Sequence, residues 1–431
     1  MGEPAPQPDS DRSILDICFD FAEAAEDDAG DDAGSGTRDA LLALLKELAQ
    51  QLRATTEEED REMFVGEDGI ELVIAALGRH SADGGVIKAA WSVLQHTCKN
   101  QPPHRRMVAG GGGLELLVKA LVDFAADASV FRVLLGAANQ LCTKDERNKV
   151  MINGLGGTAS ILAALESFGS DEAMVAALLE TLTWLMRDDD ESVEQSFRSD
   201  MIGALWEQNL LDVLIDIVEA DETAELVLNN ALRVLMLFCD SDKGAEDAVD
   251  NGLVDLSLGL LRTRLDQHSV LCASTRLLKD LCMHNESAKE SLLSEEADEL
   301  LLGLLKSHTA HAAVLESAMS LLLGIMFRDE STSEKLVEKG LIATVITGLS
   351  THPTDKLLFR SSCMMLRELC RVEDNQRIMK EEGVEKLMVA GMKLFAEAGG
   401  AGAGERAYKG KIPFQEYGRD VLRDCHSDHC V

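Results

Sequence analysis

The sequence is poor in residues that interrupt helices and in residues that build aromatic cores. Its 431 residues include only seven prolines, and three of these are Pro4, Pro6 and Pro8. Proline breaks helices and central strands, so its scarcity after residue 8 favours long helical stretches. Phe, Trp and Tyr together make up 4% of the chain, whereas 46% of it is hydrophobic. A large core of aliphatic side chains is therefore expected.

Basic residues are scarce relative to acidic ones. The chain has 41 Lys and Arg against 76 Asp and Glu, a formal net charge of −35. It lacks the positive charge with which proteins neutralise nucleic-acid phosphates, and anionic membrane surfaces are disfavoured for the same reason. A protein partner with a basic surface or segment is favoured, because the negative charge raises association rates at low salt.

Long apolar runs are missing as well. No uninterrupted apolar run reaches the roughly 18 residues of a membrane span. The opening "MGEPAPQPDSDRSILDICFDF" has no basic stretch followed by an apolar one, as a secretory signal would. We expect a cytoplasmic protein, with a nuclear location or a place in a larger assembly left open.

Motifs that carry catalysis are absent from the sequence. It contains no GxxxxGK[ST] phosphate loop, no HExxH and no GxSxG. The acidic run "RDDDE" at 187–191 lacks the spacing of a calcium loop. No enzyme activity, cofactor or metal ion is therefore expected.

The C-terminal "CHSDHC" contains four side chains that can bind zinc: Cys425, His426, His429 and Cys430. Their spacing differs from that of the usual zinc fingers. A metal site, the cap of a terminal helix and an unstructured end remain alternatives.

What the sequence does contain is a repeat. A turn residue precedes an apolar helical run at eight places, with intervals of 44, 44, 52, 43, 44, 44 and 43 residues: Gly69, Gly113, Gly157, Asn209, Gly252, Glu296, Gly340 and Gly383. The run after Gly69 is apolar at i, i+3, i+4 and i+7, through Ile70, Val73, Ile74 and Leu77, whereas the run after Gly340 fits one residue late. A short amphipathic segment precedes each turn and a longer apolar helix follows. One such repeat cannot bury its apolar faces alone, but stacked repeats can.

This period and the glycine at the turn resemble the armadillo repeat. Glycine suits a sharp turn between helices because it accepts positive φ without steric cost. HEAT repeats are the close alternative, but they lack the short first helix marked by glycine. The resemblance implies an all-α, right-handed armadillo-type solenoid of about eight repeats of 43–44 residues, spanning residues 57–395.

The regions that flank the array have different compositions. Residues 1–36 hold eleven acids against one base, Arg12, and are predicted to form a disordered acidic arm. Within it, "SILDICFDFAEAAEDD" leaves open a solubilising tail, folding on a partner, or a return onto the chain's own groove. Residues 37–56 predict a capping helix pair or the end of a degenerate first repeat. Residues 396–431 predict a glycine-rich loop and a helix that completes the last repeat.

The 52-residue interval indicates an insertion from Arg187 to Trp206. Its Asp run, the unit "ERNKVMINGLGG" and the terminal "VLRDC" are similar to the armadillo-repeat-containing protein 6 family. The chain departs from that family in its shorter, more acidic N-terminal region and in a loop without the family's histidines. The resemblance implies a protein-binding solenoid rather than a defined activity. The insertion is interpreted either as a binding loop or as neutral loop growth.

Five cysteines recur in one phase of the repeat: Cys98, Cys142, Cys239, Cys282 and Cys370, with Met186 and Met326 at matching positions. We interpret them as small buried apolar residues. An intracellular setting argues against disulfides.

In an armadillo array the last helix of each repeat lines a concave groove, where a nuclear-import receptor binds basic peptides with a ladder of Trp and Asn four residues apart. That ladder is mostly absent here, because the amide position in later repeats is predicted to be apolar: Leu235, Leu278, Leu322 and Leu366. The residues predicted to contact a partner are Trp91, Gln95, Asn139, Thr183, Arg187 and Trp206. Trp91 is the expected anchor, because buried aromatics dominate interface energies.

The sequence thus predicts a non-catalytic scaffold or adaptor that binds a protein along this groove. A transport or chaperone-like receptor for basic clients is the alternative, which steep salt dependence would distinguish. The oligomeric state and the partner are not predicted.

Overall fold

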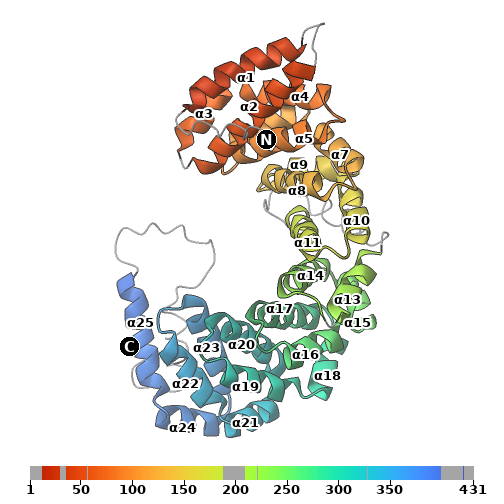
Figure 1. Cartoon of the computed structure of the whole chain (residues 1–431). Coiled ribbons are helices and arrows are strands. Elements are labelled where there is room, and N and C mark those ends of the chain that lie inside the picture. Colours follow the sequence, from red (N-terminus) through yellow and green to blue (C-terminus); the bar gives the residue numbers. More distant parts are fainter. Residues whose placement is uncertain are drawn as a thin grey trace, which may run out of the picture. The chain divides into compact units, whose positions relative to one another are not determined.

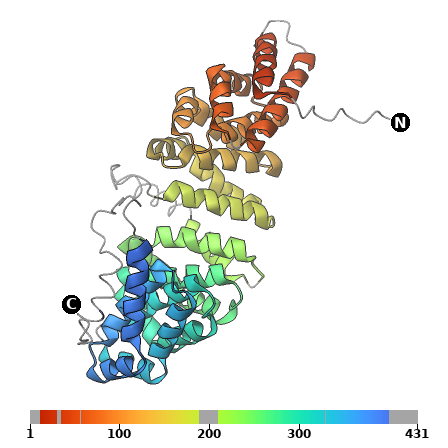
Figure 2. The ribbon, with the colours of Figure 1, turned by 90° about the vertical axis from the view of Figure 1, so that its left-hand side faces the viewer.

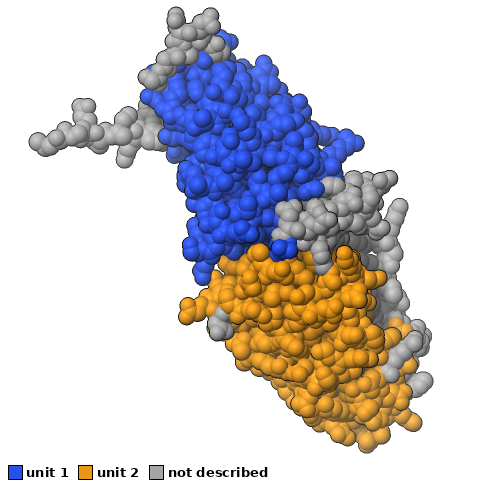
Figure 3. Space-filling view, turned by 90° about the vertical axis from the view of Figure 1, so that its right-hand side faces the viewer, with its two compact units in different colours: residues 1–210 blue, residues 211–431 orange. Residues whose placement is uncertain are grey.

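The computed structural model describes residues 12–29, 35–55, 57–187, 209–220, 222–327, 329–398 and Val421. These described residues form 24 α-helices and no strand. They fall into two compact units, unit 1 (residues 1–210) and unit 2 (residues 211–431), shown in Figure 3. Among the described helices, none is long and apolar enough to cross a membrane.

The helices recur in sets of three. The first helices are nine residues long: α3 (Glu58–Gly66), α6 (Pro102–Gly110), α9 (Glu146–Gly154), α15 (Asp242–Asp250), α18 (Glu286–Ser294), α21 (Glu330–Glu338) and α24 (Glu373–Glu381). The second helices are α4 (Gly69–Arg79), α7 (Gly113–Asp123), α10 (Gly157–Ser167), α13 (Leu210–Glu219), α16 (Leu253–Thr263), α19 (Ala297–Ser307), α22 (Leu341–Thr351) and α25 (Val384–Ala398). The third helices are α5 (Gly84–Thr97), α8 (Ala128–Cys142), α11 (Glu172–Met186), α14 (Glu225–Phe238), α17 (His268–His284), α20 (Ala312–Met326) and α23 (Lys356–Leu369). The predicted short helix, turn, helix, loop and helix is therefore the repeating element of this all-α fold.

Each second helix follows a residue with left-handed backbone, with φ between 54° and 90°: Asp68, Gly112, Gly156, Asn209, Gly252, Glu296, Gly340 and Gly383. The predicted turn residue is therefore wrong by one position in the first three repeats. The residues two, five and nine positions after the left-handed residue are buried both after Gly112 and after Gly340. The apolar run after Gly340 therefore has the same register as the run after Gly112, and the predicted shift of one residue is wrong. The left-handed residue is a better reference for the register than the glycine that follows it.

Gly113 is a glycine for another reason. A Cβ atom there would lie 2.6 Å from Cγ1 of Val108 and 2.7 Å from the Val108 carbonyl oxygen. Carbon atoms cannot approach that closely, so the first residue of α7 has no room for a side chain. Gly113 therefore allows α6 to pack closely against α7. The residue with positive φ is its neighbour, Gly112.

The third helices pack side by side within each unit, and the second helices pack against them (Figure 1). Four third helices begin at an aspartate whose carboxylate accepts backbone N–H groups of the first turn: Asp83, Asp127, Asp171 and Asp355. Such N-caps satisfy donors that a helix leaves without intrahelical partners. The core between the layers is mainly Leu, Ile, Val and Ala, as the scarcity of aromatics predicts.

A helix begins within the predicted acidic arm. Helix α1 (Ile14–Ala29) lies beside α2 (Ser35–Ala54) and packs on α3 and α4 (Figure 2). Its buried residues Ile14, Ile17, Cys18 and Phe21 follow the i, i+3, i+4, i+7 spacing. The prediction of disorder across residues 1–36 is therefore wrong for this helix, because burial of one apolar stripe outweighs the acidic composition. The helix pair is α1 with α2, and residues 37–54 belong to one helix.

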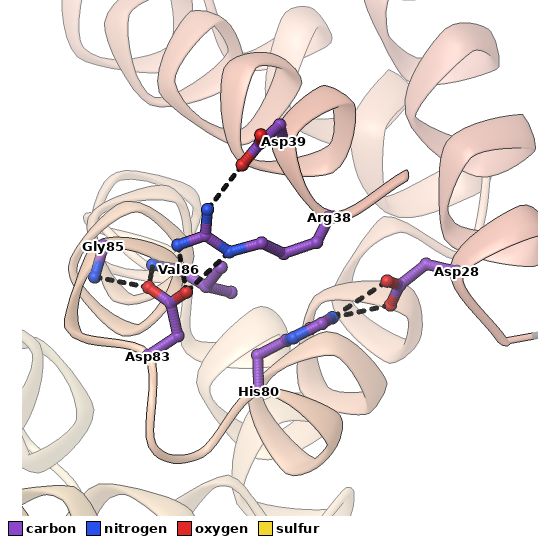
Figure 4. Close-up of polar contacts among 7 residues, drawn as sticks. All are labelled: Asp28, Arg38, Asp39, His80, Asp83, Gly85 and Val86. Atoms are coloured by element: carbon purple, nitrogen blue, oxygen red, sulfur yellow. Dashed lines mark hydrogen bonds and ion pairs between the residues drawn. The ribbon is translucent and has the colours of Figure 1, made fainter. Parts of the chain in front are cut away.

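Polar contacts fix α1 and α2 to the first repeat (Figure 4). The buried carboxylate of Asp28 on α1 lies 2.8 Å from Nε2 of His80 and accepts a 3.0 Å hydrogen bond from Nε of Arg79. Arg38 on α2 donates through Nε to Asp83, at 2.7 Å, while Asp83 also caps α5. Each aspartate therefore joins an N-terminal helix to the turn between α4 and α5.

Candidate partner-binding groove

The predicted anchor Trp91 lies inside unit 1. It is on α5 with 0% of its surface exposed, and its indole nitrogen has no hydrogen-bond partner among the described residues. A partner cannot reach this side chain without opening the core. Trp91 is therefore a packing residue in this structure.

Gln95, Asn139 and Thr183 occupy one position on α5, α8 and α11. The Gln95 amide packs against Gly136 of α8, where a Cβ atom would lie 2.6 Å from Nε2. Asn139 is half-buried and its side-chain oxygen has no described partner. The Thr183 hydroxyl is buried and donates to the Leu179 carbonyl at 2.9 Å. The structure thus places these three residues on neighbouring helices, with little surface exposed.

Arg187 directly follows α11. Its guanidinium carbon lies 5.8 Å from the centre of the Trp184 ring, in a cation–π contact. Trp206 and residues 188–208 of the insertion lie outside the described residues, as do Cys425, His426, His429 and Cys430. Among described residues, no cluster of His, Cys, Asp or Glu is arranged to bind a metal ion.

The cysteine positions correct the register of the ladder in unit 2. Gln95 and Asn139 lie three residues before Cys98 and Cys142, and the matching residues in unit 2 are Lys279, Leu323 and Arg367. The sequence instead predicted Leu278, Leu322 and Leu366, which lie one residue earlier and are fully buried, as is Leu235. The repeating cysteine was the signal that could have found these positions from sequence.

These corrected positions line an open groove, here called the unit 2 groove. It consists of two hollows of about 420 and 310 Å³, which share Leu323, Phe327 and Met364. Its walls are the C-terminal halves of α17, α20 and α23, three adjacent third helices, and the first turn of α18. Three large apolar side chains are exposed there: Met283 by 69%, Phe327 by 51% and Met364 by 43%. Exposed apolar side chains grouped in this way mark interaction surfaces.

Charged side chains border this apolar surface. Lys279 and Lys289 lie on one side and Arg367 and Arg371 on the other, with Glu286 and Glu368 among them. Lys279 and Lys289 are half-buried, and neither forms an ion pair or hydrogen bond within the described residues. The groove therefore combines apolar and cationic groups.

Of the repeated cysteines, Cys98, Cys142 and Cys239 are buried thiols, as predicted, whereas Cys282 is only half-buried and lines the unit 2 groove. Cys98, Cys142, Cys239 and Cys282 are free, and burial raises the pKa of each to about 12. Such thiols are poorly nucleophilic at neutral pH. Cys370 is also buried but is disulfide-bonded, which differs from the expectation of thiols throughout.

No protein-family model matches the chain, and no curated protein matches it either. Among solved structures, a crystal structure of an engineered protein is similar over 94% of this chain and 88% of its own, with 17% sequence identity and a TM-score of 0.68. A second engineered protein is similar over 62% of this chain and 98% of its own, with 18% identity and a TM-score of 0.50. At these identities the likeness concerns the helical fold alone.

Proposed function

We propose that the chain is a non-catalytic, armadillo-type interaction scaffold or adaptor that binds a protein partner along its third helices. The observation that carries the proposal is the exposure of Met283 and Met364 on α17 and α23 and of Phe327 directly after α20, three adjacent third helices. Apolar groups gathered in one groove gain free energy when a partner covers them.

Repeat geometry supports the armadillo type. A nine-residue first helix, an 11-residue second helix and a longer third helix recur every 43 or 44 residues outside the insertion. The similarity of the insertion to the armadillo-repeat-containing protein 6 family points the same way. A cytoplasmic or nuclear location is part of this proposal, because Cys98, Cys142, Cys239 and Cys282 are free thiols, although Cys370 is disulfide-bonded.

A receptor for basic client proteins is the second candidate. The net charge of −35 favours it, because long-range attraction raises association rates. Its binding would weaken steeply from low to moderate salt, whereas binding through the apolar groove would not.

Photocrosslinking from the groove tests the proposal. A photoreactive amino acid replaces Met283 in the full chain. In the matched control it replaces Leu265, which is 49% exposed and lies between α16 and α17 of the same unit. We expect discrete crosslinked proteins from position 283 at moderate salt and none of them from position 265. The same products from both positions, or none from position 283, would contradict the proposal.

A further inference from the structure

The charge of the unit 2 groove is opposite to that of the chain. Its lining holds four cations, Lys279, Lys289, Arg367 and Arg371, against two carboxylates, Glu286 and Glu368. The whole chain has 41 basic residues against 76 acidic ones. The lining of this groove therefore has more cations than carboxylates, although the whole chain has more acidic than basic residues.

Apolar and cationic groups occupy different parts of this groove. Across α17, α20 and α23 the corrected ladder position reads Lys279, Leu323 and Arg367. Four residues further along the chain stand Met283, still on α17, and Phe327 and Arg371, which lie directly beyond α20 and α23. Both residues at the middle helix, Leu323 and Phe327, are therefore apolar. The neighbouring α17 carries Lys279, and the neighbouring α23 carries Arg367.

The cations on the α17 side are available to a partner. Lys279 and Lys289 have no ion pair among the described residues, whereas on the opposite side Arg371 pairs with Glu368 at 3.6 Å. Burial of a half-buried ammonium under a partner is unfavourable unless a carboxylate or similar acceptor accompanies it. The lysines therefore select for acidic groups on whatever covers Met283.

From this arrangement we infer that the unit 2 groove takes an acidic peptide segment of a partner protein, with apolar side chains at its centre and Asp or Glu on both flanks. The apolar centre covers Leu323, Phe327 and Met364, and the flanks meet the lysines and the arginines. Methionine adapts its shape to different apolar side chains, so Met283 and Met364 suit an extended, variable ligand. The inference rests on the proposed function and names its partner class, opposite in charge to the one that the bulk composition favours.

The test uses the full chain and a fluorescent synthetic peptide with Leu and Ile at its centre and Glu on both flanks. Fluorescence anisotropy compares it with a peptide in which Lys replaces every Glu and with one in which Ser replaces the apolar centre. We expect the acidic peptide to bind best, and the Lys279→Glu, Lys289→Glu double variant to weaken it about tenfold, since each rim ion pair contributes under about 1 kcal/mol. Lys380→Glu, an exposed change on α24 of the same unit, should leave affinity unchanged, and thermal unfolding checks that all variants fold.

Several outcomes would overturn the inference. Tighter binding of the lysine peptide, an equal effect of Lys380→Glu, or no binding of the acidic peptide would each do so. A concentration-dependent dimer that Met283→Glu dissociates would assign the groove to a second copy of the chain. If crosslinking from position 283 still captures discrete proteins while the acidic peptide fails to bind, the scaffold function stands and only the partner class is wrong.

Discussion

The two units use the fourth residue of their first helices differently. In unit 1 it is Arg61, Arg105 or Lys149, and each donates to carbonyl groups at the ends of third helices: Arg61 to His96, Arg105 to Cys98 and Thr143, and Lys149 to Arg187. In unit 2 the matching residues are Ala245, Lys289, Ser333 and Gln376. Gln376 donates to the Cys370 carbonyl at 2.7 Å, whereas Ser333 donates to Asp329 at the start of its own helix, and Lys289 has no such bond among the described residues.

Exposed apolar residues follow the same division. Large exposed apolar side chains of unit 1 lie on α1 and on first and second helices or the turns beside them, and none lies on the described α5, α8 or α11. In unit 2, Met283 and Met364 lie on third helices and Phe327 directly after one. One architecture thus gives two surfaces: the buried Arg105 and Lys149 and the half-buried Arg61 bind the third-helix ends in unit 1, while Lys289 lines an open groove in unit 2. We therefore expect the first set of residues to contribute to stability, and we propose that the second set contributes to recognition.

Truncation of Trp91 should have the largest effect on stability. Trp91→Ala removes a fully buried side chain and should lower the free energy of unfolding by about 4 kcal/mol. Met283→Ala removes an exposed side chain and should change it by no more than about 0.5 kcal/mol. Urea unfolding followed by circular dichroism measures both. If Trp91→Ala stayed fully stable but no longer bound the partner, Trp91 would be a contact residue rather than a packing residue.

Removal of one cation from each unit tests the comparison directly. Lys149 is fully buried and lies 2.8 Å from the buried Glu146 carboxylate, so Lys149→Ala removes a cation that neutralises this carboxylate and should cost about 3 kcal/mol. Lys289→Ala should cost less than about 0.5 kcal/mol. Replacing the pair together, by Lys149→Met with Glu146→Leu, should recover most of the loss, because no unpaired charge remains. Equal losses from the two single alanine variants would contradict the division between the units.

The turns between second and third helices predict different responses to acid. In unit 2 the rings of His268 and His311 stack with centroids 3.6 Å apart, beside His308, whereas unit 1 has Phe131 against Phe168. His311 is exposed, but the side chains packed around its ring partly desolvate it and so lower its pKa, and the nearby His268, His308 and His352 lower it further. The folded state therefore binds fewer protons than the unfolded one. This contribution is complete above the unfolded pKa of about 6.5 and is lost as pH falls below it.

Thermal unfolding of the full chain and of His311→Asn at neutral pH and near pH 5 measures this effect. The decrease in melting temperature on acidification should be smaller in the variant. Hydrogen exchange should place the acid-sensitive opening in unit 2. An unchanged pH dependence in His311→Asn would show that this histidine does not set it.

Much of the fold could be predicted from the sequence because burial imposes a period. Apolar residues after Gly112 and Gly340 had to recur at helical spacing to reach the core, and the 43–44-residue interval is visible without a structure. The turn itself was misplaced in early repeats, because Gly112 and Gly113 stand together and serve different needs. Helix α1 was missed because its acidic composition hid the spacing of Ile14, Ile17 and Phe21.

The groove could be predicted only in part. The armadillo resemblance predicts that a partner binds along the third helices. It does not distinguish the half-buried Lys279 from the buried Leu278 next to it. One residue along a helix turns the side chain by about 100° around the helix axis. The repeated cysteine, which is buried at Cys98, Cys142, Cys239 and Cys370, would have fixed that angle. Trp91 is predicted to anchor a partner because it is aromatic, but the residue type does not show whether a tryptophan is exposed or buried.

The smallest effect expected concerns Cys282, a thiol that lines the unit 2 groove. Burial raises its pKa to about 12, so the thiolate is a minor species at pH 8 and alkylation should be slow, rising about tenfold per pH unit. The acidic peptide, once bound, should slow alkylation of Cys282 further, whereas Cys98, fully buried in unit 1, should react slowly with or without it. Mass spectrometry of iodoacetamide-treated protein measures each site. Peptide-dependent protection of Cys98 equal to that of Cys282 would mean that the ligand stabilises the whole chain rather than covering the groove.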